Sequence, residues 1–291
     1  MSSKKIISVV VITYNRKKLL EKCLKSLLNQ DFDRDYYEII IVDDGSNDGT
    51  KKLVKSIKSK RIRYYFQQNK GYGAARNLGL GKTKTKFVAF TDDDCIPEKN
   101  WLRKIMINFK EFPEVTAVGG SILTPFDDRL SWAAHILNFS SWMPNGEKRF
   151  VKDIPTANIS YRKSDIKKSF IKAKGVGYED SLFNKAIIDN KKKILYDPSI
   201  KITHLAKYNT LEEFLSNQRR YGDGFIKQGF KVHGLIGKVL TKVKIINLFC
   251  PRLILVFARC SKSRKFLYEF ARNFDLIFRG EFERGLTIIK K

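Results

Sequence analysis

The sequence predicts an α/β protein built on a doubly wound, mostly parallel sheet with helices on both faces, followed by a C-terminal helical region. Two observations predict this class. Short apolar runs alternate with segments whose apolar residues recur at helical spacing, as expected of successive strand–helix units. Polar clusters follow three of these runs, as happens where the strands of such a sheet end at a ligand-binding crevice.

The first strand–helix units lie at the start of the chain. Residues 6–12 form a β-branched apolar run, which is typical of a strand buried on both faces. Leucines at helical spacing in 16–28 predict a helix, and "EIIIV" at 38–42 predicts a second buried strand. In the following "DDGSNDGT" we expect Ser46 or Asn47 to cap the next helix.

The next units repeat this order. Residues 61–67 predict a short third strand, and the glycine-rich "NKGYGAARNLGL" predicts a turn into a helix. The apolar run 87–90 predicts a fourth strand that ends in three consecutive aspartates, and a helix is expected over 101–109.

The second half of the chain is less regular. Residues 115–120, residues 154–165 and "DPSIKIT" before His204 each predict a strand. Residues 125–149 show no clear periodicity and predict a loop. Its tryptophans fit either a core position or an exposed one, where they would stack on a ligand ring or enter lipid.

Composition limits the partners. The chain has 291 residues and a formal net charge of +27, which favours an anionic partner such as a phosphorylated small molecule or an anionic lipid surface, or else reflects a general lysine bias. Four cysteines show no CxxC spacing, which favours reduced thiols over a zinc site or a disulfide framework. No stretch reaches the ~20 apolar residues of a membrane-spanning helix.

The three aspartates 92–94 predict a metal site. Adjacent carboxylates repel one another unless a cation neutralises them, and Asp43 and Asp44 stand at an equivalent strand end. Mg²⁺ or Mn²⁺ shared between carboxylates and substrate phosphates would do so, with Arg16, Lys70 and Arg76 providing positive charge for the phosphates. The alternative is a solvated acidic turn that caps the helix at 101–109.

Five motifs carry a family resemblance. In this order, "VVVITYNR", "IIIVDDGSNDGT", "NKGYGAARNLGL", "FTDDDCIPEKNWL" and "GVGYEDSLF" resemble the family 2 glycosyltransferases, which have the GT-A fold, and in particular bacterial and archaeal enzymes of cell-surface polysaccharides. The resemblance covers about residues 6–225. It implies a GT-A domain over 1–225, with a nucleotide-sugar donor half at 1–110 and an acceptor half at 111–225, and a basic helical region at 226–291.

The resemblance also implies residue roles. Asp180 is expected to be the catalytic base, with Glu179 beside it in the acceptor-side motif. Asp94 is expected to hold a divalent cation together with Asp92 and His204, although a lone histidine is more often structural. The residues implied in donor binding are Thr13, Tyr14, Asn15, Arg16, Asp43, Asp44, Lys70, Gly71, Arg76, Asp92, Asp93, Ala157 and Asn158.

The implied reaction follows from this set. Transfer from a nucleotide sugar leaves negative charge on a diphosphate, which a divalent ion and an arginine stabilise. One base on the acceptor side, with in-line displacement, implies inversion at the anomeric carbon. "QRRYGDG" at 218–224 departs from the Q-x-x-R-W of processive relatives, which favours transfer of a single sugar. The expected donor is a UDP, GDP or dTDP sugar, and the expected acceptor is a glycan or a lipid-linked glycan.

The C-terminal region, residues 226–291, is rich in Lys and Arg. Apolar residues at helical spacing between Leu235 and Ile246 alternate with lysines, the pattern of a basic amphipathic helix on an anionic membrane. A packed appendage with solvated lysines is the alternative. We therefore expect a cytoplasmic protein, peripheral on the inner face of the cell membrane, and no nucleic-acid partner, since no recognised motif is present.

Two other functions remain open on the sequence. A sugar nucleotidyltransferase would use a similar crevice, but it normally has a glycine-rich loop after the first strand, and "VITYNRKK" has no glycine. A non-catalytic nucleotide-sugar-binding protein would leave Asp180 without a role.

Overall fold

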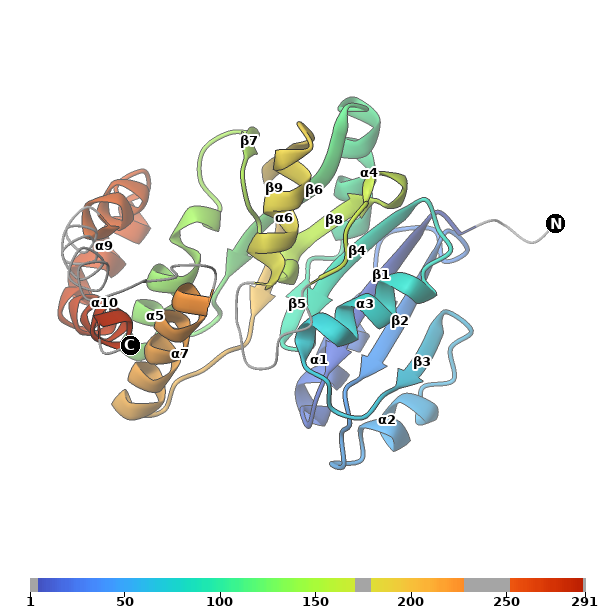
Figure 1. Cartoon of the computed structure of the whole chain (residues 1–291), viewed down its shortest axis with the longest axis horizontal. Helices are drawn as coiled ribbons and strands as arrows, with labels where there is room; N and C mark the ends of the chain where they lie inside the picture. Colours follow the sequence, from blue (N-terminus) through green and yellow to red (C-terminus); the bar gives the residue numbers. More distant parts are fainter. Residues whose placement is uncertain (1–4, 171–178, 228–251, 290–291) are drawn as a thin grey trace, which may run out of the picture. The chain divides into compact units, whose positions relative to one another are not determined.

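The protein is represented by a computed structural model that describes residues 5–170, 179–227 and 252–289. The described chain forms two compact units (Figure 1). The first unit contains residues 5–123, 147–170 and 179–205, and the second contains 124–146, 206–227 and 252–289. Each unit is described by itself.

The first unit is built on one mixed sheet whose strands run in the order β3-β2-β1-β4-β8-β6-β9-β5, with β7 paired to β9. Its first four strands are parallel. They are β3 (Ile62–Phe66), β2 (Tyr37–Asp43), β1 (Ile7–Thr13) and β4 (Phe87–Asp92). Every residue of β1 and β2 is buried, which explains their unbroken apolar sequences. The predicted α/β class with a mostly parallel sheet is confirmed.

Helices cover both sides of this sheet (Figure 1). They are α1 (Lys17–Leu28), α2 (Thr50–Ser56), α3 (Tyr72–Lys82), α4 (Trp101–Glu111) and α6 (Glu179–Asp189). Helix α1 buries its leucines at the spacing that predicted it. The parallel pairing of β1 with β2 and with β4 brings the carboxyl ends of the three strands to one edge, which positions the site.

The predicted start of α2 is wrong. Neither Ser46 nor Asn47 caps this helix, which begins at Thr50 after Gly49 with a positive φ of 87°. The Asp48 carboxylate accepts the Thr50 amide at 3.1 Å and the Thr50 hydroxyl at 2.6 Å. The Asp48 side chain thus forms an Asx-type turn with Thr50, so the helix begins at Thr50 instead of being capped by Ser46 or Asn47.

The remaining strands lie beyond β4. They are β8 (Ile159–Arg162), β6 (Val115–Leu123), β9 (Lys193–His204), β5 (Cys95–Pro97) and β7 (Arg149–Val151). Strand β8 runs antiparallel to both β4 and β6, and β9 pairs in parallel with β6 and antiparallel with β5. The antiparallel β5–β9 pair sets Cys95 opposite His204, next to the turn that holds the aspartates.

The second unit is helical. Its elements include α5 (Arg129–Phe139), the short 3₁₀ helix η1 (Ser140–Trp142), α7 (Leu211–Lys227), α9 (Arg264–Arg272) and α10 (Phe274–Ile289). Its core includes Trp132, Leu137, Phe214, Phe266 and Ile277. C-terminal helices are thus present, as the sequence predicted.

The predicted loop at 125–149 is wrong over α5, and Trp132 lies in the core with 4% of its surface exposed. Eight of the eleven α5 residues are buried, so no polar face interrupts the apolar one. A helix buried on most sides has no amphipathic period, and this removed the signal on which the sequence prediction depends.

Two sequence predictions lie partly outside the described residues. The basic amphipathic helix predicted between Leu235 and Ile246 falls within 228–251, and residues 175–178 of the acceptor-side motif fall within 171–178. In the described part of the chain, no helix combines the length and the apolar character that crossing a membrane requires.

Candidate active site

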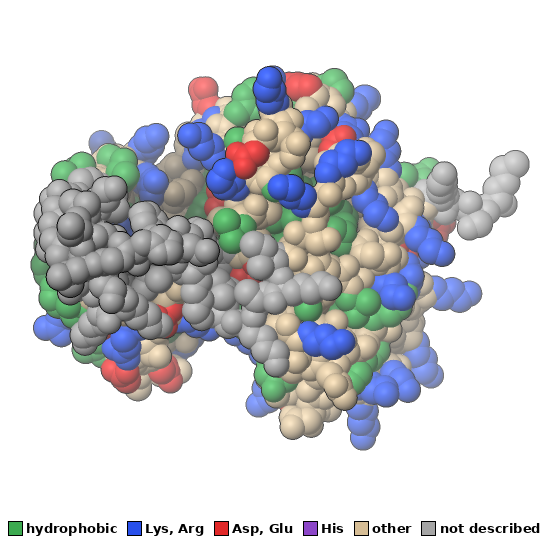
Figure 2. All heavy atoms as spheres, viewed as in Figure 1, with side chains coloured by type: hydrophobic (Ala, Val, Ile, Leu, Met, Phe, Trp, Pro, Cys, Tyr) green, Lys and Arg blue, Asp and Glu red, His purple; other side chains and the backbone are tan. Residues whose placement is uncertain are grey.

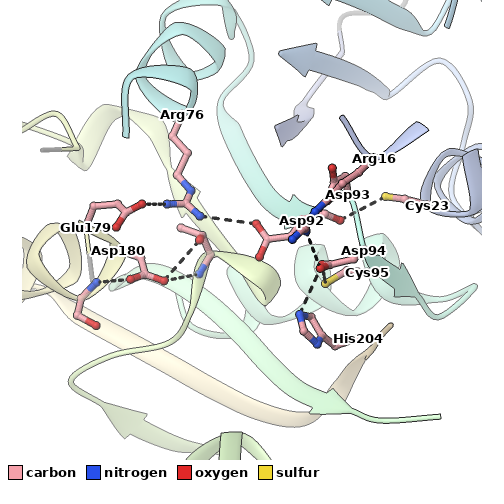
Figure 3. Close-up of polar contacts among 12 residues, drawn as sticks. Arg16, Cys23, Arg76, Asp92, Asp93, Asp94, Cys95, Glu179, Asp180 and His204 are labelled. Carbon is pink, nitrogen blue, oxygen red and sulfur yellow. Dashed lines mark hydrogen bonds and ion pairs between the residues drawn. The ribbon is translucent and has the colours of Figure 1, made fainter. Parts of the chain in front are cut away.

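The carboxyl end of β4 carries three aspartates that lie close to the end of β1 (Figure 3). Asp92 ends β4, and Asp93 and Asp94 form the turn into β5. The Thr13 hydroxyl at the end of β1 donates to Asp93 Oδ2 at 2.7 Å. The neighbouring parallel strands therefore bring these side chains together, as predicted.

Arg16, just before α1, is the nearest cation to this cluster. Its guanidinium donates to Asp94 Oδ2 at 2.9 Å and to Asp93 Oδ1 at 3.2 Å. Burial opposes the charged form of Arg16, but the charges of Asp94 and then Asp93 outweigh it, so its pKa is raised further above its usual range. Arg16 thus stays charged and offsets part of the negative charge.

One arginine does not neutralise the cluster. Burial raises the pKa of Asp93 to about 7, although Arg16 opposes this. Burial also raises the pKa of Asp92, against the influence of Arg76. Burial acts in the same direction on Asp94, but His204 and Arg16 outweigh it and lower the pKa of that carboxyl. A bound divalent cation would stabilise the charged forms of all three.

His204, at the end of β9, completes the residues that fit a divalent ion. Its Nε2 lies 3.5 Å from Asp94 Oδ1. The ligand atoms of Asp94, Cys95 and His204 all lie within 4.8 Å of one another. Carboxylate oxygens with an imidazole suit Mn²⁺ or Mg²⁺, so Asp94 and His204 fit such an ion, whereas a ligand role of Asp92, whose Oδ1 lies 3.7 Å from Arg76, stays a prediction.

Arg76, on α3, links this cluster to the acceptor-side motif (Figure 3). It is buried, its Nη1 lies 3.0 Å from Glu179 Oε1, and its Nη2 lies 3.7 Å from Asp92 Oδ1. Burial opposes its charge, but Asp92, Asp180 and Glu179 outweigh burial and raise its pKa. The structure therefore places Arg76 between the buried Glu179 and the partly exposed Asp92, whereas sequence reasoning assigned it to phosphate contact.

Glu179 and Asp180 begin α6 and have different surroundings. Glu179 is buried against Arg76. Asp180 is partly exposed, and its Oδ2 accepts the Thr156 amide at 3.2 Å while its Oδ1 accepts the Ser181 amide at 2.9 Å. Asp180 is thus an oriented carboxylate with access to solvent, whereas Glu179 is an internal ion-pair partner.

Asp153 lies behind Asp180 and was not singled out by the sequence. It accepts the Ser181 hydroxyl at 2.6 Å and the Asn184 amide at 2.7 Å. Burial, followed by the charge of Asp180, raises the pKa of Asp153. No sequence pattern connects Asp153 to α6, because the contact spans 28 residues of chain.

On the donor side, the aspartates after β2 order the surrounding loops. Asp43 accepts the Ser46 amide at 2.8 Å and the Tyr64 hydroxyl at 2.6 Å. Asp44 accepts the backbone amides of Lys70 and Gly71, both at 2.9 Å. The structure brings Asp44 together with Lys70 and Gly71, as the sequence suggested, through main-chain hydrogen bonds.

The loop after β1 is tied to the same region. Asn15 has a positive φ of 52°, and its amide donates to the Ser46 hydroxyl at 2.8 Å while its side-chain oxygen accepts the Asn47 amide at 2.9 Å. Tyr14 is exposed on this loop. These bonds fix the β1 loop against the β2 loop.

Ala157 and Asn158 lie in η2 (Thr156–Asn158) and are buried. The Asn158 side chain accepts the Trp101 indole N–H at 2.8 Å and donates to the carbonyls of Ser121 and Ile200. Its amide therefore holds the core together behind Thr156, which contacts Asp180. A donor contact of Ala157 or Asn158 stays a prediction.

A mixed, mostly parallel sheet with carboxylates at the ends of its strands is the arrangement expected of a GT-A domain. Residues 8–173 match the protein-family model described as "Glycosyl transferase family 2". The chain belongs to this family.

Curated relatives agree. A beta-1,3-glucosyltransferase of Campylobacter jejuni, named for the substrate GalNAc(5)-diNAcBac-PP-undecaprenol, is 32% identical over 190 residues, which cover 64% of this chain and 54% of that protein. Glycosyltransferase AglE of Haloferax volcanii is 32% identical over 101 residues, which cover 34% of this chain and 33% of AglE. The matches thus span about half or less of the length of these relatives.

Solved structures share the fold. A mannosyltransferase of Pyrobaculum calidifontis, solved with GDP-Man and Mn²⁺, superposes with a TM-score of 0.65 at 16% identity and covers 98% of this chain and 87% of its own. TarS of S. aureus, solved with UDP-GlcNAc, gives a TM-score of 0.58 at 20% identity and covers 95% and 90%. At these identities the likeness shows the GT-A fold alone.

Proposed function

We propose that this protein is a metal-dependent, inverting and non-processive glycosyltransferase. It moves one sugar from a nucleoside diphosphate sugar to a hydroxyl of a glycan or lipid-linked acceptor. The observation that carries the proposal is the separation of the carboxylates into two sets with Arg76 between them: the aspartate cluster after β4 and the pair at the start of α6. A leaving diphosphate and an attacking hydroxyl require two such sets.

The donor side holds the leaving group. Asp94, Asp92 and His204 are the residues that would bind a divalent cation, which when bound supplies positive charge to the departing diphosphate. Arg16, next to this cluster, adds a second positive charge. The ordered loops at Thr13–Asn15 and Lys70–Gly71 shape the nucleotide side of the pocket, with Asp43 and Asp44 beneath them.

The acceptor side handles the proton. Asp180 takes the proton of the attacking hydroxyl, and the Thr156 amide orients its carboxylate. Glu179 is bound to Arg76, and Asp153 is bound to Ser181 and Asn184. Asp180 is therefore the carboxylate of this group best suited to act as the base, and one base acting on the incoming hydroxyl gives inversion in a single displacement.

The relatives support the substrate classes. Two structural neighbours were solved with GDP-Man and with UDP-GlcNAc, which supports a GDP or UDP sugar as donor, while a dTDP sugar stays a prediction from the sequence. The name of the Campylobacter relative includes an undecaprenol-linked substrate, which supports a lipid-linked acceptor here.

Membrane contact would bring the enzyme to such an acceptor. We infer a peripheral position on the cytoplasmic face of the membrane, held by the basic region from about residue 226, beyond the GT-A domain of 1–225. The described part of this region supports the inference through exposed aromatic residues on α10, where Phe274, Phe278 and Phe282 are 43–50% exposed. Aromatic residues near basic side chains favour an anionic membrane surface.

The test incubates the full chain with UDP, GDP and dTDP sugars, Mn²⁺ and a lipid-linked oligosaccharide acceptor. We expect nucleoside diphosphate release, a mass gain of one sugar on the acceptor, and an inverted anomeric configuration by NMR. Asp180→Asn should keep donor affinity but lose transfer by about 10²-fold or more, the scale of general-base catalysis. Asp189→Asn, at the exposed end of α6, is the matched control and should retain full activity.

Three results would refute the proposal. Pyrophosphate release would indicate a nucleotidyltransferase. Donor binding without transfer to any acceptor would indicate a binding protein. Full activity of Asp180→Asn would show that Asp180 is not the catalytic base.

A further inference from the structure

Cys95 lies inside the aspartate cluster, at a position that its sequence spacing did not reveal. It begins β5, and the antiparallel register places it directly opposite His204 of β9. Directly opposed residues on antiparallel strands have Cβ atoms about 4.5–5.5 Å apart, so their side chains reach one common point. Asp94, the preceding residue, joins them from the turn (Figure 3).

Two of the three distances among these side chains are close to those of a metal-ligand set. Cys95 Sγ lies 3.7 Å from Asp94 Oδ1, and His204 Nε2 lies 3.5 Å from the same oxygen. In a tetrahedral zinc site with ordinary Zn–S, Zn–N and Zn–O bonds, neighbouring ligand atoms lie about 3.4–3.6 Å apart. The third distance, from thiol to imidazole, is within 4.8 Å. Shifts of a few tenths of an ångström at the first two distances would therefore give tetrahedral spacing.

We propose that Asp94, Cys95 and His204 form a binding site for a thiophilic divalent ion of the Zn²⁺, Co²⁺ and Cd²⁺ class. Such an ion would share Asp94 and His204 with the hard catalytic ion of the proposed function and would exclude it. Three protein ligands leave the fourth tetrahedral position for water or an anion.

The ligand chemistry distinguishes the two kinds of ion. Carboxylate and imidazole accept Mn²⁺ and Mg²⁺, whereas a thiolate shifts preference towards Zn²⁺ and similar ions. Without an ion, the Cys95 thiol donates to Asp94 Oδ1, while Asp94 Oδ2 faces Arg16. Binding replaces the S–H bond with a sulfur–metal bond and releases the thiol proton to the buffer. The Arg16 contact is not disturbed, because it uses the other oxygen.

A second buried cysteine provides a matched control. The Cys23 thiol lies near the same aspartates but donates to the backbone carbonyl of Asp92 at 3.6 Å. It is outside the group of ligand atoms that lie together. The proposal therefore predicts a role for Cys95 but not for Cys23, although both thiols are buried near the same aspartates.

The experiment titrates Co²⁺ into the reduced full chain, without donor or acceptor. We expect a thiolate-to-cobalt charge-transfer band and intense tetrahedral visible bands in the wild-type protein and in Cys23→Ser. Cys95→Ser should lose the charge-transfer band and bind Co²⁺ at least roughly tenfold more weakly, the lower end of losses seen when metal sites are disturbed. Excess Mn²⁺ should raise the Co²⁺ midpoint, because the two ions share Asp94 and His204.

The outcomes are separable from failure of the proposed function, since no turnover is measured. Loss of the band in Cys23→Ser but not in Cys95→Ser, or an absent band in the wild-type protein, overturns the site. If excess Mn²⁺ leaves the midpoint of the Co²⁺ titration unchanged, the two ions do not share Asp94 and His204, and this part of the proposal is overturned. Circular dichroism confirms folding, and His204→Asn, which keeps the thiol, should also weaken binding. An unchanged affinity in a folded His204→Asn counts against the assignment.

Discussion

Arg76 is the side chain on which the two halves of the site depend. It is buried and lies within ion-pair distance of Glu179 on one side and Asp92 on the other. A buried charge whose partner is removed retains its desolvation cost without compensation. The arginine thus links the aspartate cluster after β4 to the start of α6.

Arg76→Met should therefore be strongly destabilising. We expect a loss of about 3–5 kcal/mol in the free energy of unfolding, the scale for breaking a buried ion pair from one side. Denaturant titration measures it. Arg103→Met is the control, because the Arg103–Asp31 pair is more than half exposed and should contribute about 0–1 kcal/mol. Equal stability of the two variants would contradict the central position of Arg76.

The proposed role of Asp94 gives a second prediction. Asp94→Asn removes one ligand charge while Asp93 keeps its contacts with Arg16 and Thr13. We expect weaker Mn²⁺ binding by calorimetry and a large loss of the metal response of turnover. Asp189→Asn should behave as wild type. Full turnover with an unchanged metal response in Asp94→Asn would rule out this carboxylate as a ligand.

The raised pKa of Asp153 predicts that the stability of the protein depends on pH. Its pKa is raised in the folded protein, mainly by burial and then by Asp180, so folding disfavours its charged form. Its contribution to stability therefore decreases as pH rises from about 4, the ordinary aspartate value, through the raised folded pKa. Asp153→Asn should gain in melting temperature relative to wild type over that interval, while Asp189→Asn should show no such trend. A difference in melting temperature between Asp153→Asn and wild type that stays constant from pH 4 to 8 would contradict this prediction.

At the scale of elements, α3 shows how closely a helix can approach the sheet. A Cβ at Gly79 would lie 2.4 Å from Val10 Cγ1 and 3.3 Å from Val42 Cγ2, on β1 and β2. At Gly81, two residues later, nothing lies within 4 Å of such a Cβ. The close contact at Gly79 sets the depth of the helix that carries Arg76.

These two glycines form a matched pair of substitutions. Gly79→Ala should destabilise by about 1–3 kcal/mol, since overpacking shifts the backbone or β-strand side chains. Gly81→Ala should be neutral or stabilise by up to about 1 kcal/mol through helix propensity. Thermal and denaturant unfolding of both variants checks the pair. If both substitutions changed the free energy of unfolding in the same direction, packing at Gly79 would not limit how closely α3 approaches the sheet.

Whether an element can be predicted from the sequence depends on which of its side chains are buried. Strands β1, β2 and β4 lie inside a parallel sheet, so they appear in the sequence as apolar runs followed by site residues. Helix α5 was missed because it is buried on most sides. The Asp153–Ser181 contact and the Cys95–His204 pairing were also missed, because they depend on tertiary folding and strand register, which local periodicity does not encode.

At the scale of the whole molecule, positive charge dominates. The chain carries a net charge of +27, and Figure 2 shows Lys and Arg side chains spread over the described surface of this face. Such a field attracts anionic partners over a distance set by ionic strength. It favours both a nucleoside diphosphate donor and an anionic lipid surface.

Membrane contact can be tested on the full chain by co-sedimentation with vesicles. We expect binding to anionic but not neutral vesicles, weakening with salt, since each basic side chain near the surface contributes about 1 kcal/mol. Replacing Phe274, Phe278 and Phe282 by serine should reduce binding further at high salt, where apolar contact remains. Tyr36→Ser, an exposed aromatic of the first unit, is the control. Equal pelleting of neutral and anionic vesicles, or no pelleting, would contradict peripheral attachment.

The hydrogen bonds from Asp44 to the Lys70 and Gly71 amides have a thermodynamic consequence. Gly71 has a φ of 87°, a conformation that glycine adopts without strain, and the carboxylate holds it there before any ligand arrives. Ordering a loop on binding costs conformational entropy that is subtracted from affinity. In the proposed function this segment contacts the donor, and because it is already ordered, less of the contact energy with the donor would be lost to ordering the loop.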